Sequence, residues 1–176
     1  MSASKVRIAA AAALAVGVAL AASPASARTA VPKGSCKLLT VREVGEILGT
    51  PSDAGKQKTR SAAGITGDRC VWEAEKKGTG GLKGRPLELE VVVESGTTLV
   101  DSYQKAKAAD PIESDDVPGL GDDAFVKDLK LHVLVGDRVL STAFHNYRYP
   151  KPLTEDQIQQ KEEDAARIAL GRLPAA

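Results

Sequence analysis

The sequence predicts an α+β domain, in which an antiparallel β-sheet carries helices packed mainly on one face. Capping-type starts mark three helices, and apolar residues with a period of two mark strands between them. The expected order of elements is α-β-β-α-β-β-β-α. Helices that separate groups of strands in this way favour an antiparallel sheet with helices covering one face.

Residues 1–27 have the pattern of a secretory signal peptide. Lys5 and Arg7 form a positive start, residues 8–22 are apolar and uncharged, and residues 25–27 supply the small side chains that signal peptidase recognises. The apolar run of about 15 residues is shorter than the roughly 20 residues of a membrane span. We therefore expect secretion, with at most a loose association with the cell wall.

The chain after the leader is expected to contain a flexible lead-in over residues 28–35 and a single domain over residues 36–176. Without the two basic residues of the leader, 22 of the 24 basic residues remain against 23 acidic ones, a net charge of −1. This balance gives no electrostatic reason to expect nucleic acid or an anionic membrane as a partner. We also expect no stable membrane insertion after the leader is removed.

Two cysteines, Cys36 and Cys70, follow the leader. In an oxidising compartment, an isolated pair favours one disulfide bond. A redox site is not expected, because the chain has no C-x-x-C motif. Zinc would need more ligands than two cysteines and two distant histidines supply, so we expect no metal and no cofactor.

The first helix is predicted over residues 41–48. Thr40 and Glu43 have the spacing of a capping box, and Gly49 stands where a helix ends. Residues 51–67 are polar and rich in small side chains, which indicates a mobile loop.

Two strands are predicted next, over residues 70–73 and 87–93. The period of two places Cys70 and Trp72 on one face, so a disulfide bond at Cys70 would bring Trp72 beside it. The intervening residues 76–86 are charged and glycine-rich. They lack the Gly-Lys-Ser/Thr of a phosphate-binding loop, so we expect a hairpin connection.

A second helix is predicted from Thr98 to about Ala109, with Pro111 as its stop. Residues 110–123 are acidic, but their carboxylates lack the spacing of a calcium-binding loop. We expect a solvated loop there. A last helix is predicted after the capping box of residues 154–157.

Residues 129–146 predict a β-hairpin with Gly136 and Asp137 as its two-residue turn. This turn would pair Val135 with Arg138, Val133 with Leu140, Leu131 with Thr142, and Leu129 with Phe144. One face of the hairpin is then mostly apolar and should cover the core. The other face carries Lys130, His132, Ser141 and His145.

Two histidines on the polar face are candidate functional residues. In this register His132 lies opposite Ser141, and His145 lies opposite Asp128. At about 3.3 Å per residue the two rings start more than about 10 Å apart, so they cannot easily share a metal ion. His145 with Asp128 supplies two members of a catalytic triad, but the chain has no G-x-S-x-G nucleophile motif.

Tyr147 and Tyr149 extend the same face in continued strand geometry. Aromatic rings with a polar rim bind sugars, peptides or partner proteins. The alternative is that both rings cover the connection to the last helix.

Several short motifs also occur in a recognisable order. They are Cys36-Lys37-Leu38-Leu39-Thr40, Glu43, Ile47-Leu48-Gly49, Cys70-Val71-Trp72 and Val117-Pro118-Gly119-Leu120-Gly121-Asp122-Asp123-Ala124. In that order they resemble an actinobacterial family of exported proteins, domain of unknown function 3558, many of whose members are envelope lipoproteins. The resemblance implies a small α+β domain with its two cysteines bridged. Cys36 follows Lys33-Gly34-Ser35 and lies well beyond the apolar run, so lipid anchoring is not expected.

Together these observations predict a secreted, non-enzymatic module that binds an unknown envelope component or extracellular protein. The candidate binding residues are His132, His145, Tyr147 and Tyr149. The alternatives are a secreted hydrolase that uses His145 and Asp128, and a ligand-sensing domain.

Overall fold

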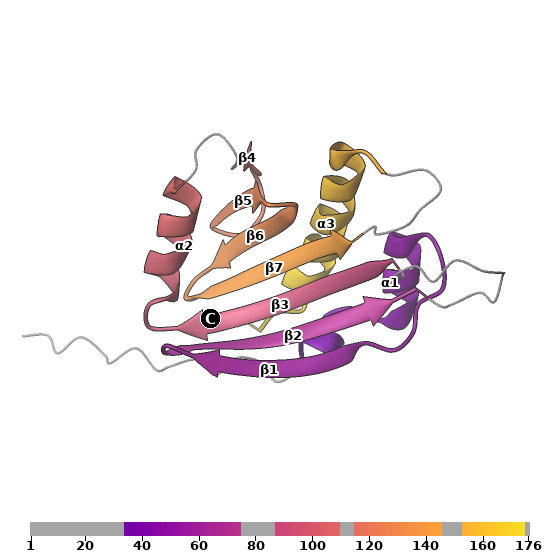
Figure 1. Cartoon of the computed structure of the whole chain (residues 1–176), viewed down its shortest axis with the longest axis horizontal. Helices are drawn as coiled ribbons and strands as arrows, with labels where there is room; N and C mark the ends of the chain where they lie inside the picture. The colour runs from indigo at the N-terminus through magenta and orange to yellow at the C-terminus, as the bar shows by residue number, and fades with distance from the viewer. Residues whose placement is uncertain (1–33, 75–86, 110–114, 146–152, 175–176) are drawn as a thin grey trace, which may run out of the picture.

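The computed structural model of the chain describes residues 34–74, 87–109, 115–145 and 153–174 (Figure 1). Its centre is one sheet of seven strands in the order β1-β2-β3-β7-β6-β5-β4. All neighbouring strands pair in the antiparallel sense. The predicted α+β class with an antiparallel sheet is confirmed.

The helices are the short 3-10 helix η1 (Ser35–Lys37) and the α-helices α1 (Val41–Leu48), α2 (Leu99–Ala108) and α3 (Glu155–Leu170). The strands are β1 (Lys56–Ala62), β2 (Ile65–Glu73), β3 (Glu88–Gly96), β4 (Asp115–Asp116), β5 (Asp123–Lys127), β6 (Lys130–Val135) and β7 (Arg138–His145). This order differs from the predicted one by the additional strands β1 and β4.

Two of the α-helices pack on one face of the sheet, and the third packs on the other. The larger apolar cluster joins α1 and α3 to alternate residues of the central strands, such as Leu89, Val91 and Leu140. A smaller cluster joins Leu99 and Tyr103 of α2 to the opposite face. The helices therefore lie mainly on one face, as predicted, and α2 is the exception.

The predicted disulfide bond joins Cys36 to Cys70, and it fastens η1 to β2. Trp72 is buried beside it, on the same face of β2. The packing there is tight, because a Cβ added to Gly55 would lie 2.4 Å from Cys70 Sγ and 2.6 Å from Trp72 Nε1. Only glycine fits at this position without displacing the disulfide bond or the indole.

The predicted capping boxes are present at two of the three helices. Thr40 caps α1 together with Glu43, and Thr154 caps α3 together with Gln157. Thr98 makes no side-chain capping bond at α2, so that part of the prediction is wrong. The reason is its backbone: with φ −108° and ψ 4°, Thr98 does not adopt the extended conformation that an N-cap residue needs.

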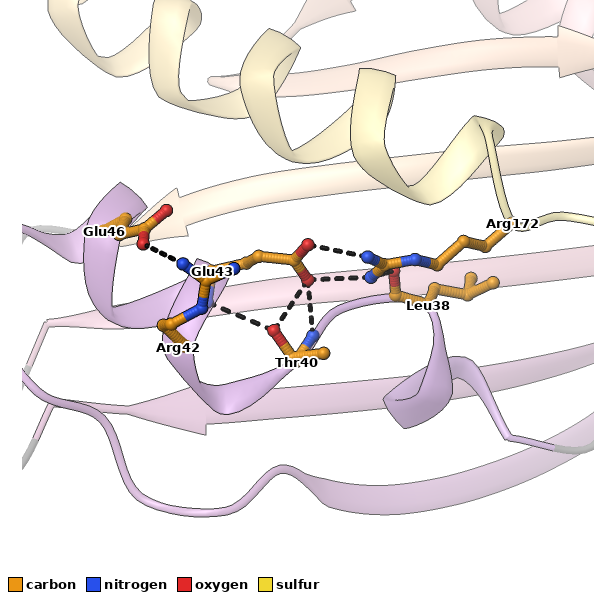
Figure 2. A network of polar contacts seen from close by, with 6 residues as sticks. All are labelled: Leu38, Thr40, Arg42, Glu43, Glu46 and Arg172. Carbon is orange, nitrogen blue, oxygen red and sulfur yellow. Dashed lines mark hydrogen bonds and ion pairs between the residues drawn. The ribbon is translucent and has the colours of Figure 1, made fainter.

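Glu43 also links the start of α1 to the end of the chain (Figure 2). Arg172 donates to both carboxylate oxygens of Glu43, at 2.6 and 2.7 Å, and to the carbonyl oxygen of Leu38 at 2.9 Å. The hydrogen bond from Arg172, with those from Thr40, lowers the pKa of Glu43 to about 2. One carboxylate therefore caps α1 and holds the segment that follows α3.

The prediction of a mobile loop over residues 51–67 is wrong. β1 and the start of β2 form a hairpin there, with Ala63 and Gly64 at the turn, where both have positive φ. All seven residues of β1 are exposed. A strand without a buried face has no alternating apolar pattern, so the period-of-two signal could not reveal it.

The predicted register of the β6–β7 hairpin is confirmed from Val135–Arg138 to Leu131–Thr142. The predicted pairing of Leu129 with Phe144 is wrong. Leu129 has φ 54° in the turn between β5 and β6, and it is half exposed. Phe144 pairs with Leu89 of β3 instead.

Candidate functional site

Polar side chains gather on the sheet face that carries α2. Leu89 and Val91 of β3 belong to the main core, so alternation along the strand turns Glu90 to this face. The same argument applies to His132 of β6 and to His145 of β7. These three residues come from three adjacent strands, in the order β3-β7-β6.

A hollow of about 460 Å³ lies on this face beside α2, and we call it the histidine hollow. Its lining residues are Ala106, Phe125, Lys127, Asp128, Leu129, Lys130, His132, Ala143 and His145. The structure thus brings together the two histidines singled out in the sequence. Its volume lies within the range of about 300–1,000 Å³ that small-molecule sites occupy.

Packing and a hydrogen bond fix the ring of His132. Its Nδ1 lies 2.9 Å from Ser141 Oγ, and the ring stacks on Phe125 with 5.1 Å between centroids. Burial, with a contribution from the charge of Lys130, lowers the pKa of His132 to about 4. The imidazole is therefore neutral at pH 7, and its position is set before any ligand binds.

Glu90 is the central charged group of the face, and its side chain is only 9% exposed. Arg69 Nη2 lies 2.6 Å from one of its carboxylate oxygens, Lys130 Nζ lies 3.3 Å from the other, and His145 Nε2 lies 4.0 Å away. Burial alone would raise the pKa of Glu90, but the charges of Lys130 and Arg69 outweigh it and lower the pKa. Glu90 therefore stays ionised and holds three cationic or basic side chains in place.

A second hollow, of about 730 Å³, extends from this cluster toward β1. Arg60, Arg69, Glu90, Glu94 and Lys130 are its charged lining residues. Lys130 lines both hollows, so they adjoin.

The predicted strand register, in which His145 lies opposite Asp128, is wrong. Asp128 lies in the turn between β5 and β6 with φ 52°, and His145 pairs with Glu88 of β3. The two residues nevertheless line the same hollow. The hydroxyl of Ser141 contacts His132, but Ser141 is only 3% exposed, so this hydroxyl is not presented to a ligand.

Tyr147 and Tyr149 lie outside the described residues. The sequence analysis did not predict that Glu90, Arg69 and Lys130 form a charged cluster. One signal could have revealed Glu90: it is a charged residue between Leu89 and Val91, in a strand whose alternate residues are apolar. Its partners belong to two other strands, and their proximity depends on the strand order.

The predicted solvated loop covers residues 110–123, and the structure describes residues 115–123 of it. Three carboxylates in this part have partners. Asp116 and Asp123 each lie 2.8 Å from Lys107 Nζ, and Asp122 accepts a hydrogen bond from the backbone N–H of Gly136. Among the described residues, no three His, Cys, Asp or Glu side chains are grouped so that they could hold a metal ion. None of the helices in the described part of the chain is long and apolar enough to cross a membrane.

The fold and the site define a single-disulfide α+β domain with two adjoining hollows on one sheet face. Comparisons of the chain with protein-family profiles, curated proteins and solved structures found no match.

Proposed function

We propose that the protein is an exported, non-enzymatic binding module whose ligand occupies the histidine hollow. The observation that carries the proposal is the convergence of His132 and His145 in one hollow of small-molecule size. The disulfide bond supports export, because such bonds persist in oxidising compartments. We also propose that the protein belongs to the exported family, domain of unknown function 3558, that its motifs resemble.

The lining of the histidine hollow suits a ligand that combines an apolar part with hydrogen-bonding groups. Leu129 and Ala106 supply exposed apolar surface over the almost fully buried Phe125 and Ala143, and the ring of His132 supplies a polar edge. Lys127, Asp128 and Lys130 are the charged members of the same lining, and Lys130 is also paired with Glu90. An envelope component with an apolar group next to hydrogen-bonding groups such as hydroxyls matches this arrangement.

We prefer binding to hydrolysis because the hydroxyl group of Ser141 and the imidazole of His145 both have other contacts. Ser141 is buried, and its Oγ is held by His132 Nδ1. His145 Nε2 lies 4.0 Å from the carboxylate of Glu90, which is itself held by Arg69 and Lys130. The same groups therefore fix the shape of the hollow and do not form a nucleophile with its general base.

A substitution that fills the hollow from its rim tests this function. Ala106 is an exposed residue of α2 that lines the hollow, whereas Ala108 is exposed on the same helix and does not line it. Saturation-transfer NMR with a solvent-extracted envelope fraction should detect a bound small molecule with the unchanged protein and with Ala108→Trp. The signal should disappear with Ala106→Trp. A signal that persists in Ala106→Trp, or that the unchanged protein does not give, would contradict the proposed site.

A further inference from the structure

Strand β1 forms an exposed edge of the sheet. In the described part of the chain, β1 pairs with β2 on one side only, and all seven of its residues are exposed. A strand edge of this kind presents backbone N–H and C=O groups to which another extended segment can add. The length of β1 is sufficient for a partner strand of ordinary size.

Positive charge is concentrated on one side of this edge. Lys56, Lys58 and Arg60 alternate along β1, so their side chains share one face. Arg69 lies directly across from Lys58 in the register with β2. Lys56 pairs with Glu73 at 2.8 Å. Among the described residues, Lys58 and Arg60 have no ion-pair partner, so their charges are available to an incoming chain.

The second hollow begins beside the same edge. Arg60 and Ala62 of β1 belong to its lining, together with Ile65 and Gly67 of β2. Gly67 lies across from Arg60, and the side chain of Glu94 covers it: a Cβ added to Gly67 would lie 3.3 Å from Glu94 Cγ and 3.5 Å from its Oε1. A strand added to the free side of β1 would place side chains next to Arg60, at the rim of this hollow.

We propose that β1 binds an extended acidic segment of another protein, which adds to the sheet as a strand with its acidic side chains facing Lys58 and Arg60. Acidic residues at alternate positions of the partner would lie on the cationic side of the edge. A second copy of this chain does not fit, because two β1 strands would place like charges opposite one another, which is destabilising. This interaction surface is separate from the histidine hollow and goes beyond the proposed function.

The test uses isotope-labelled protein purified after export and a blocked eight-residue peptide in which Glu and Thr alternate. A control peptide of the same composition carries its four Glu residues in one block. We expect the alternating peptide to shift the backbone amide signals of β1 and to slow hydrogen exchange there. The control peptide should bind more weakly, since only half as many of its charges can face the edge.

Charge reversal at the edge should weaken this binding. We expect Lys58→Glu/Arg60→Glu to weaken the alternating peptide at least about tenfold, because it replaces attraction by repulsion at two adjacent contacts. Arg42→Glu reverses an exposed charge on α1 and should leave the affinity unchanged. Lys58→Gln/Arg60→Gln should give an intermediate affinity, and it replaces the first variant if that one does not fold.

Four outcomes would overturn the proposal: no binding to the unchanged protein, equal affinity for the two peptides, amide shifts away from β1, or an affinity that the edge variants do not change. Ala106→Trp should bind the peptide normally. Loss of the small-molecule signal in that variant therefore tests the histidine hollow alone, and the two proposals can fail separately.

Discussion

The carboxyl group of Glu162 accepts a hydrogen bond from the backbone N–H of Phe144 at 2.9 Å, inside the core between α3 and the sheet. The pairing of β6 with β7 ends at Leu131 and Thr142, although β7 continues alongside β3. The second carboxyl oxygen of Glu162, Oε2, is buried and has no hydrogen-bond partner among the described residues. Glu162 thus satisfies the backbone N–H of Phe144 beyond the point where the two strands stop pairing.

Replacement of Glu162 should separate its roles as hydrogen-bond acceptor and as buried acid. Glu162→Ala removes the acceptor and leaves a cavity, so we expect a loss of about 2–4 kcal/mol in the free energy of unfolding. Glu162→Gln keeps an acceptor for Phe144 N–H and should be far less destabilising. Urea unfolding at pH 7.5 measures both. Equal losses in the two variants would show that the hydrogen bond to Phe144 does not stabilise the fold.

The stability of the protein should fall as the pH rises from 6.5 to 8. Burial raises the pKa of Glu162 to about 8, so its contribution is fully present below the ordinary value of 4.5 and is lost as the pH rises through 8. The lowered pKa of His132 acts in the opposite sense, but only as the pH falls from 6.5 through about 4. Thermal unfolding of Glu162→Gln between pH 6.5 and 8 should show a smaller slope than the unchanged protein. The same slope in both would contradict this assignment.

The contact between Arg172 and Glu43 should stabilise the fold more than an ordinary surface ion pair. Arg172 makes two hydrogen bonds to the carboxylate and a third to Leu38, whereas Arg42 and Glu46 form a single exposed pair within α1. We expect Arg172→Ala to lower the urea midpoint more than Arg42→Ala does. Equal effects would mean that the link across the fold is no stronger than the exposed pair.

Loss of the disulfide bond should destabilise the domain by about 3–4 kcal/mol if the loop-entropy relation holds for this bridge. Cys36 and Cys70 are 34 residues apart in the sequence. Chemical unfolding of the double variant Cys36→Ser/Cys70→Ser and of the oxidised protein measures this difference in the free energy of unfolding. A loss below about 1 kcal/mol would show that η1 is held by other contacts, such as the bonds from Gly34 and Ser35 to Asp68.

Local signals in the sequence predicted the parts of the fold that depend on neighbouring residues. The capping boxes at Thr40 and Thr154, the Gly136 turn and the hairpin register follow from short-range chemistry, and the structure confirms them. The bridge between Cys36 and Cys70 followed from the cysteine count and the leader. β1 was missed because none of its residues is buried.

The candidate site could be predicted only in part. The polar hairpin face indicated His132 and His145, but the partner of His145 depends on which strand lies next to β7. No short-range pattern shows that β3 takes this place and brings Glu90 near His145. Glu162 was missed for a different reason: a charged residue on the buried face of α3 contradicts the apolar pattern that predicts such a face.

The most direct test of the binding function uses the fact that the chain contains only two histidines. Isotope labelling of histidine therefore gives two ring signals, and His132 and His145 both line the proposed site. Addition of the envelope fraction to the exported protein should shift both signals, and the same addition to Ala106→Trp should shift neither. If both signals stay unchanged in the unsubstituted protein while the fraction binds elsewhere on it, the histidine hollow is not the ligand site.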